Sequence, residues 1–193
     1  MAKPNLLFFR SKDEAILLDE QKLIRGCLEG DRQSFEKIVE KYRDSLYWTA
    51  YNLVLDSEDA RDVTQQAFLK IWKSLSEYDF ARSFPGWAHK IAANCAIDLL
   101  RSRRDSEPLV DDVPAEHSTL DQRIDVHKIF SRIAPLLPQR QRIVLVLREI
   151  QGMEIAEISD LLQCTESTVR NLLSQAKDSF RKRTKEIFPD YGL

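Results

Sequence analysis

One face of a predicted helix between residues 87 and 101 carries side chains that suit unpaired nucleic acid. At roughly 100° per residue, five side chains fall within an arc of about 80° and form a polar stripe: Trp87, Lys90, Asn94, Asp98 and Arg101. A flat ring can stack on a base, an amide can hydrogen-bond a base edge, and cations attract phosphate. The opposite side is apolar and predicts a buried face: Ala88, Ile91, Ala92, Cys95 and Leu99. A solvated helix face with Trp87 packed into the core is the alternative, and the polar stripe alone favours that alternative.

Basic side chains concentrate on two segments, although the whole chain has a net charge of −2. Residues 82–104 hold five basic residues and one acidic residue, and residues 165–185 hold six and two. Between them, residues 105–121 hold six acidic residues and neither Lys nor Arg. Because this segment also contains Pro108 and Pro114, it predicts a flexible linker between two basic surfaces. The alternative is that the acidic segment lies across a basic groove and mimics nucleic acid.

The rest of the sequence predicts an all-α fold that positions the polar stripe. Apolar residues recur at helical spacing, and no alternating run is long enough for a sheet. We expect helices near residues 13–29, 32–54, 57–75, 85–103, 121–135, 138–150, 154–162 and 166–186. Asp31 and Ser57 stand where helix caps are expected, and Pro85 fits the first turn of its helix. The break at residues 80–86 is either a place for an extruded base or a plain turn between helices.

A helix-turn-helix is the second pattern, and it lies near the C-terminus. Residues 154–162 predict a short amphipathic helix, Gln163 and Cys164 a turn, and Thr165 the N-cap of a second helix. The polar face of that second helix consists of Arg170, Asn171, Ser174, Lys177 and Arg181. Such a face suits the major groove of duplex DNA. Any short helical hairpin with a basic face gives a similar pattern.

Little in the sequence indicates catalysis, metal binding or membrane insertion. His89, His117 and His127 have no ligand spacing, and neither a phosphate-binding glycine loop nor a nucleophile motif occurs. Three cysteines, far apart in the chain, predict neither a disulfide framework nor a zinc site. The apolar run at residues 6–9 is too short for a signal peptide, and nothing approaches the length of a membrane span. We therefore expect a cytoplasmic protein that is not an enzyme and needs no cofactor.

Several sequence blocks occur in an order and spacing that resemble the extracytoplasmic-function (ECF) sigma factors, the compact two-domain group of the bacterial sigma-70 family. In the first half these blocks are residues 34–39 and 56–68 and the pattern WxxKIAxNxxxDxxR, which begins at Trp87. In the second half they are residues 137–142, 147–149 and 168–170. The resemblance extends from about Leu23 to Arg183.

This resemblance implies an all-α chain of two small helical domains joined by a flexible acidic linker. Residues 1–22 would form an N-terminal arm and the start of the first helix, and residues 23–104 a sigma region 2 domain that binds core RNA polymerase and the minus-ten element. Residues 105–121 would be the linker, and residues 122–193 a region 4 domain whose helix-turn-helix reads the minus-thirty-five element. The implied function is that of an alternative sigma factor that promotes DNA melting for transcription initiation. Core RNA polymerase, promoter DNA and an anti-sigma factor are the implied partners.

The resemblance also implies roles for individual residues. Contacts with core polymerase are expected from Asp62, Gln65 and Gln66, with Phe68 and Trp72 facing inward as core. Contacts with the minus-ten element are expected from Trp87, Lys90, Asn94, Asp98, Arg101, Arg103 and Arg104. Within that set Asn94 would read a base, Trp87 would be a wedge or core support, and Asp98 would accept from a base amine or orient Arg101. Contacts with the minus-thirty-five element are expected from Arg148, Arg170, Asn171, Ser174, Gln175 and Lys177.

Four residues depart from the family pattern. Gln66 stands where an acidic residue is common, which would weaken one contact with polymerase, and Leu172 and Gln175 replace cations of the recognition helix. Gln163 stands where glycine is usual, so we expect strain or a different shape in that turn. The alternative function is a stand-alone helix-turn-helix regulator that binds an operator without polymerase. The first half of the chain, however, has no evident effector pocket.

Overall fold

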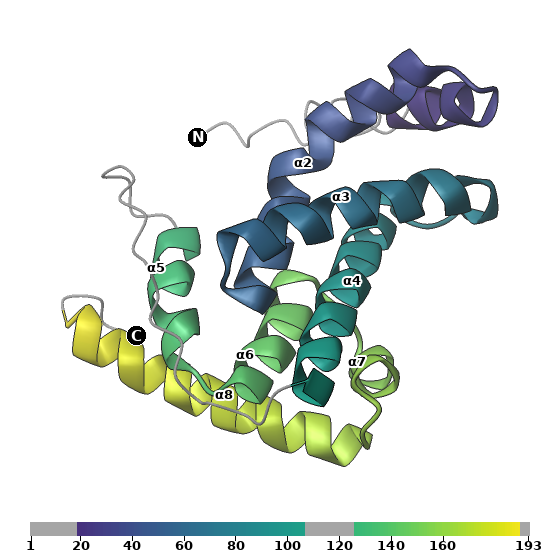
Figure 1. The fold of residues 1–193 in the computed structure, drawn as a ribbon. Coiled ribbons are helices and arrows are strands. Elements are labelled where there is room, and N and C mark those ends of the chain that lie inside the picture. The colour runs from purple at the N-terminus through teal and green to yellow at the C-terminus, as the bar shows by residue number, and fades with distance from the viewer. Residues whose placement is uncertain (1–18, 107–125, 190–193) are drawn as a thin grey trace, which may run out of the picture.

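Helices make up the regular structure of the described part of the computed structural model, which covers residues 19–106 and 126–189 (Figure 1). Residues 19–28 are helical and lead into α2 (Arg32–Val54), α3 (Ser57–Ser74) and α4 (Phe84–Ser106). The second group comprises α5 (Val126–Ile133), α6 (Gln139–Leu145), α7 (Ile155–Leu162) and α8 (Glu166–Ile187). No strand occurs in these two ranges, so the predicted all-α class is confirmed. None of the helices in the described ranges is long and apolar enough to cross a membrane.

Within the described ranges the predicted helix boundaries agree with the observed ones to within a few residues, with two local corrections. The helix starts expected near residues 13 and 121 lie outside the described residues. α3 is capped by Asp56 and not by Ser57, because the Asp56 carboxylate accepts from the amides of both Glu58 and Asp59, each at 2.9 Å. The segment expected as one helix over 138–150 changes character after α6, since residues 146–150 form a π-helical turn (η3). The acidic linker and the N-terminal arm lie almost wholly outside the described residues.

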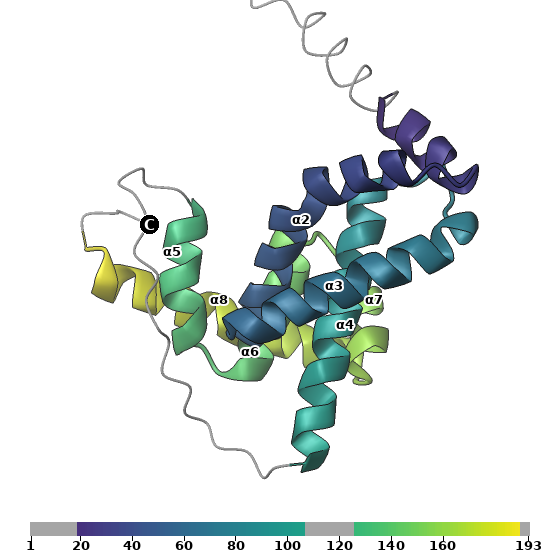
Figure 2. The ribbon, with the colours of Figure 1, turned by 45° about the horizontal axis from the view of Figure 1, so that its top comes forward.

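Packing of α2, α3 and α4 against one another forms the first domain (Figures 1 and 2). Asp31 caps α2, as expected, by accepting from two backbone amides of its first turn. The start of α4 is held by Phe84, which is 1% exposed and whose ring centroid lies 5.4 Å from those of Tyr42 and Tyr78. The Tyr42 hydroxyl in turn donates to the buried carboxylate of Glu20. These contacts fix the direction in which α4 leaves the domain.

The second domain is built around α8, which packs against α5, α6 and α7. Val169 and Ala176 are fully buried on the inner side of α8, and Phe180 stacks on Phe130 of α5 with centroids 5.7 Å apart. Thr165 caps α8 by accepting from the amide of Thr168. α7, the turn and α8 therefore form the predicted helix-turn-helix (Figure 1). The apolar side of α8 faces inward and its polar side is exposed.

Gln163, in the turn of the helix-turn-helix, adopts a left-handed backbone conformation with φ 51° and ψ 49°. This is the conformation that glycine accepts without a Cβ penalty, which confirms the strain expected there. We predict that Gln163→Gly raises the free energy of unfolding by roughly 0.5–1 kcal/mol, as measured by urea denaturation. The same exchange at Gln66, in the middle of α3, should lower it by about 1 kcal/mol. A change of the free energy of unfolding in the same direction for Gln163→Gly and Gln66→Gly would contradict the prediction.

Candidate nucleic-acid interface

The polar stripe occupies a narrow strip of α4 that is flanked by buried residues on both sides. The expected apolar side is buried at Ala88, Ala92 and Cys95 and half-buried at Ile91 and Leu99. Beyond the opposite edge of the stripe, Ile97 and Leu100 are also buried, and both line a pocket shared with the second domain. α4 is therefore covered by its own domain on one side and by the second domain on the other.

Asn94 lies at a hollow between α3 and α4, which we name the Asn94 hollow. Its lining residues are Lys70, Lys73, Ser74, Ile91 and Asn94. The Ser74 hydroxyl donates to the Lys70 carbonyl at 2.7 Å. The hollow thus combines a side-chain amide with two ammonium groups, which is a suitable set for a base edge and its phosphates.

The residues of α3 that line this hollow were not among those expected from the sequence. Lys70, Lys73 and Ser74 are three and four positions apart, so they form one row on the predicted helix. That row was a detectable signal of a basic surface. Its place opposite Asn94 depends on how α3 and α4 cross, which no spacing within a single helix reveals.

Asp98 lies between two cations of the interface. Its carboxylate is 3.5 Å from Lys70 Nζ and 3.8 Å from Arg101 Nη1. All three side chains are more than a third exposed, so these ion pairs are weak in energy. Asp98 is therefore close enough to contact both Arg101 and Lys70, and its two expected roles stay predictions.

Lys90 and Arg101 are turned toward α7 of the second domain. Lys90 Nζ lies 2.7 Å from Glu157 Oε1, and Arg101 Nη2 donates to the Leu161 carbonyl oxygen. The hydrogen bond from Lys90 is the main reason that the pKa of the Glu157 carboxyl lies below its ordinary value. In this conformation both expected phosphate contacts are therefore engaged by the protein itself.

The remaining members of the minus-ten set have structural contacts or lie outside the described side chains. Trp87 is half-buried, and its ring packs 5.2 Å from Tyr78 and 5.6 Å from Phe84. Trp87 thus packs against the aromatic core on one side, and its wedge role stays a prediction. Arg103 forms a two-point contact with Asp59 at the start of α3, at 2.5 and 2.6 Å. The side chain of Arg104 is not among those described.

A separate surface lies on the outer side of α3, and we name it the α3 docking surface. Its members are Asp62, Gln65, Gln66 and Leu69. All four are exposed, and Leu69 is 60% exposed. Phe68 is buried as expected.

Trp72, near the end of α3, corrects one expectation. It was expected to face inward as core, but it is 39% exposed. Its ring lies 4.7 Å from Phe35 of α2, in an edge-on arrangement. Because α3 packs mainly against α2 and α4, a ring at its C-terminal end is covered on one side only.

Five of the six expected duplex contacts lie on α8 and are exposed, and the sixth, Arg148, lies in η3 and is partly buried. Three of the six also have partners elsewhere in their domain: Lys177 pairs with Glu149, Gln175 bonds to Gln141, and Arg148 donates to the Met153 carbonyl and pairs with Glu154. Asn171 and Ser174 are exposed in the first part of α8, and Arg170 pairs there at 2.5 Å with Glu166 of the same helix.

Metal ligands do not gather anywhere in the ranges 19–106 and 126–189. His89, the histidine nearest the polar stripe, is mostly buried, and burial lowers the pKa of its imidazole. Its Nδ1 lies 2.8 Å from the Thr49 hydroxyl. This histidine is thus part of the packing between α2 and α4.

Comparison with known proteins gives matches over both domains. The family model described as Sigma-70 region 2 matches residues 38–106, and that described as Sigma-70, region 4 matches residues 128–179. The chain is 24% identical over 184 residues to the ECF RNA polymerase sigma factor SigW of Bacillus subtilis, covering 86% of this chain and 97% of that protein. It is 28% identical over 183 residues to the RNA polymerase sigma-H factor of Pseudomonas aeruginosa, covering 87% and 95%.

A solved structure shows the same fold. It is that of the sigma factor RpoE in complex with the anti-sigma factor NepR from Bartonella quintana. The two structures superpose with a TM-score of 0.59 at 18% sequence identity, and the match covers 79% of this chain and 98% of that one. A sigma-factor fold therefore accommodates both groups of helices described above.

Proposed function

Because this chain belongs to the sigma-70 family, in its extracytoplasmic-function group, we propose that it starts transcription through three separate surfaces. It is an RNA polymerase sigma factor, and the two matched regions do not favour a stand-alone regulator. The three surfaces are the Asn94 hollow, the exposed part of α8 and the α3 docking surface. In the complex, nucleotide addition belongs to polymerase and not to this chain.

Capture of an unpaired minus-ten base is the role that we assign to the Asn94 hollow. The observation that carries it is the meeting of Asn94 with Lys70 and Lys73 across two helices. An amide can pair with a base edge through both its donor and its acceptor, and ammonium groups neutralise phosphates on either side. A base that leaves the duplex would be held there, so that melting is driven by capture of the open form.

Duplex reading at the minus-thirty-five element is assigned to Arg170, Asn171 and Ser174. They lie in the first half of α8, after the turn, which is the part of a recognition helix that contacts base edges. Arg170 pairs with Glu166 at the surface, and an exposed pair of this kind is readily exchanged for DNA. The exposed pair of Lys177 with Glu149 can be exchanged for a phosphate in the same way, whereas Arg148 would also have to leave the Met153 carbonyl.

The α3 docking surface is proposed to bind core polymerase. Asp62, Gln65 and Gln66 lie nearer the start of α3 than Lys70, Lys73 and Ser74 of the Asn94 hollow, so polymerase and the melted strand would use successive parts of that helix. Leu69 adds an apolar centre to the polar contacts of Asp62 and Gln65, a composition typical of protein interfaces. An anti-sigma factor is proposed as a further partner, since the Bartonella relative has been solved with one. A cytoplasmic location follows from these partners.

Run-off transcription on a promoter library with purified core polymerase tests the whole proposal. Core polymerase with this chain should give transcripts from promoters that share two elements, and core alone should not. A gel-shift assay with and without core adds the discriminating control. Tight, sequence-specific duplex binding by the free chain, without any stimulation of transcription, would contradict the proposal and support an operator-binding regulator.

A further inference from the structure

The end of α4 is tied to the start of α3 by the contact between Arg103 and Asp59, which we name the clasp. The guanidinium approaches both carboxylate oxygens: Nη1 lies 2.5 Å from Oδ2, and Nη2 donates to Oδ1 at 2.6 Å. A planar guanidinium fits a carboxylate in this two-point geometry, whereas an ammonium group acts as a single point charge. The clasp therefore fixes both distance and direction between residues that are 44 positions apart in the chain.

Asp59 is much less exposed than the acidic partner of the neighbouring cations. Its side chain is 14% exposed, while that of Asp98, which lies between Lys70 and Arg101, is 59% exposed. Water cannot fully stabilise a covered carboxylate that loses its cation, so separating the clasp costs more than separating an exposed ion pair. A DNA phosphate can thus replace Asp98 at small cost, but it cannot take Arg103 without leaving Asp59 unpaired.

Both charges of the clasp also stand at helix ends that favour them. Asp59 lies in the first turn of α3, where the positive end of the helix dipole stabilises an anion. Arg103 lies in the last turn of α4, which ends at Ser106, and there the negative end of the dipole stabilises a cation. Each helix therefore supports its own half of the clasp.

The clasp is one end of a row of contacts between α3 and α4. Farther along the row, Lys70 lies 3.5 Å from Asp98, and beyond that pair Lys73 and Asn94 line the Asn94 hollow. Residue numbers rise along α3 while they fall along α4, so the two helices pass each other in opposite directions. Asn94 lies about 14 Å from Arg103 along a continuous helix. A change in the direction of α4 at the clasp is therefore carried to the hollow.

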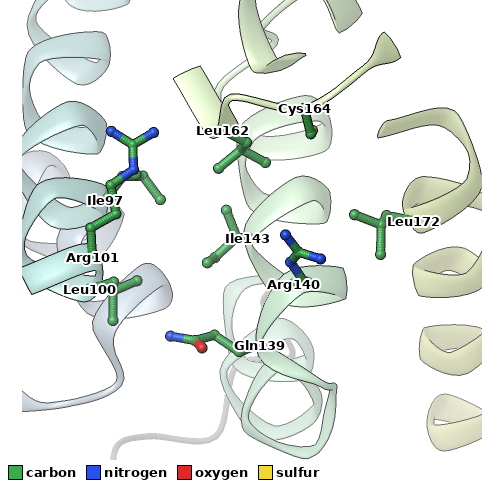
Figure 3. Close-up of a pocket in the computed structure, with 9 residues that line it drawn as sticks. All are labelled: Ile97, Leu100, Arg101, Gln139, Arg140, Ile143, Leu162, Cys164 and Leu172. Carbon is green, nitrogen blue, oxygen red and sulfur yellow. The ribbon is translucent and has the colours of Figure 1, made fainter. Parts of the chain in front are cut away.

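Arg103 differs in its surroundings from Arg101, which lies two positions earlier on α4. Two positions correspond to roughly 200° around a helix, so the two side chains leave α4 on roughly opposite sides. Figure 3 shows Arg101 beside the pocket that α4 shares with α6 and α7. Of these two cations, Arg103 is the one held by the first turn of α3.

We propose that Arg103 is a positioning residue for the strand-binding site and not a phosphate contact. Held by Asp59, it fixes the end of α4 against α3 and so keeps Asn94 opposite the two lysines of the hollow. The inference rests on the role proposed above for the Asn94 hollow. It replaces the expectation that Arg103 belongs to the minus-ten contacts.

Asp59→Asn separates the two roles of Arg103 by the direction of its effect. Permanganate reactivity of unpaired thymines measures promoter melting by the chain at saturating core polymerase. Loss of the Asp59 charge loosens the clasp, so melting should fall about two- to fivefold, the range for a partly exposed ion pair. A phosphate contact would instead be released by the same substitution. Melting that rises or stays unchanged in Asp59→Asn would therefore overturn the proposal.

Glu58→Gln is the matched control for that substitution. Glu58 precedes Asp59 in the same helical turn, its side chain is exposed, and it forms no ion pair among the described residues. Its replacement removes one negative charge from the same helix start but leaves the clasp intact, so melting should not fall. An equal loss in the two variants would mean that the charge of the helix start matters and the clasp does not, which would overturn the proposal.

A double-mutant cycle distinguishes positioning from a general loss of structure. Arg103→Gln should reduce melting about two- to fivefold in the wild-type chain. In the Asn94→Ala chain it should cause a smaller loss, because the clasp acts through the amide that is then missing. Equal losses in the two backgrounds would overturn the proposal, since an independent phosphate contact and simple destabilisation both give that result. Normal melting by Asn94→Ala alone would contradict the proposed function of the hollow itself.

The salt dependence of strand binding counts phosphate contacts directly. The chain assembled with core polymerase is titrated with a single-stranded minus-ten oligonucleotide selected in the run-off experiment. Lys73→Gln should lower the slope of log K against log salt concentration by about 0.7, the value for one phosphate contact on a single strand. Arg103→Gln should weaken binding while the slope stays at the wild-type value. A decrease of about 0.7 in the slope for Arg103→Gln would overturn the proposal and restore Arg103 to the phosphate contacts.

Discussion

Asn94→Ala is expected to reduce open-complex formation by roughly 5- to 150-fold, while binding to core polymerase stays at the wild-type level. The range corresponds to about 1–3 kcal/mol for a two-point contact between an amide and a base. Asn94 is held at the hollow by the buried residues Ala92 and Cys95 of its own helix. The substitution therefore removes the amide from a backbone position that is already set in the free chain.

Permanganate reactivity of unpaired thymines measures this loss directly, because it reports melting and not binding. Co-purification with core polymerase gives the control, since Asn94 lies on α4 and the docking surface on α3. Asn171→Ala is a matched amide deletion in the other domain. It should weaken recruitment to duplex promoters, but it should not affect melting of a promoter with a preformed bubble. Unchanged melting by Asn94→Ala would remove Asn94 from the strand-binding site.

The helices could be predicted from sequence because their signals are local. Apolar spacing located α2, α3 and α8 to within one residue at each end, and Asp31 and Thr165 marked two starts correctly. Asp56 was missed because Ser57 is also a good capping residue, and only the backbone geometry decides between neighbours. The π-helical turn after α6 was missed because its apolar residues fit an α-helix equally well.

Only the part of the site that lies on a single helix could be predicted from the sequence. The polar stripe was found from the sequence of α4. Trp87 lies at the helical angle of the stripe, but its side chain is half-buried among aromatic rings and not exposed like a polar surface residue. Contacts with Tyr78 and Phe84 draw its ring toward the aromatic core. The Lys70 side of the Asn94 hollow and the Glu157 contact of Lys90 arise from tertiary packing, with sequence separations that no periodicity spans.

Charge balance at the interface also became visible only in three dimensions. In the sequence Asp98 is an acidic residue among cations, and its carboxylate would repel the phosphates that such a surface binds. In the structure it lies between Lys70 and Arg101. A carboxylate in that position keeps two like charges near one another and oriented in the absence of DNA. The contacts are exposed, so DNA phosphates can replace the carboxylate at small cost.

The double variant Asp62→Ala with Gln65→Ala is expected to lower the affinity for core polymerase by roughly 5- to 150-fold. Each side chain can form a hydrogen bond with the partner, and one such bond contributes about 0.5–1.5 kcal/mol. Both side chains are exposed on α3, so the free energy of unfolding should change by less than about 0.5 kcal/mol per substitution. Titration of labelled chain with core polymerase measures the affinity, and urea denaturation checks the fold.

The control for this prediction is Glu40→Ala with Asp44→Ala, an exposed pair on α2 outside the docking surface. It removes polar groups of similar kind and should leave the affinity unchanged. Leu69→Ala adds a third test, because a leucine that is 60% exposed in the free chain contributes to binding only if the partner covers it. If the α3 variants retained full affinity and the α2 control lost it, polymerase would bind the other side of the first domain. The assignment of polymerase to α3, beside the strand-binding helix α4, would then be wrong.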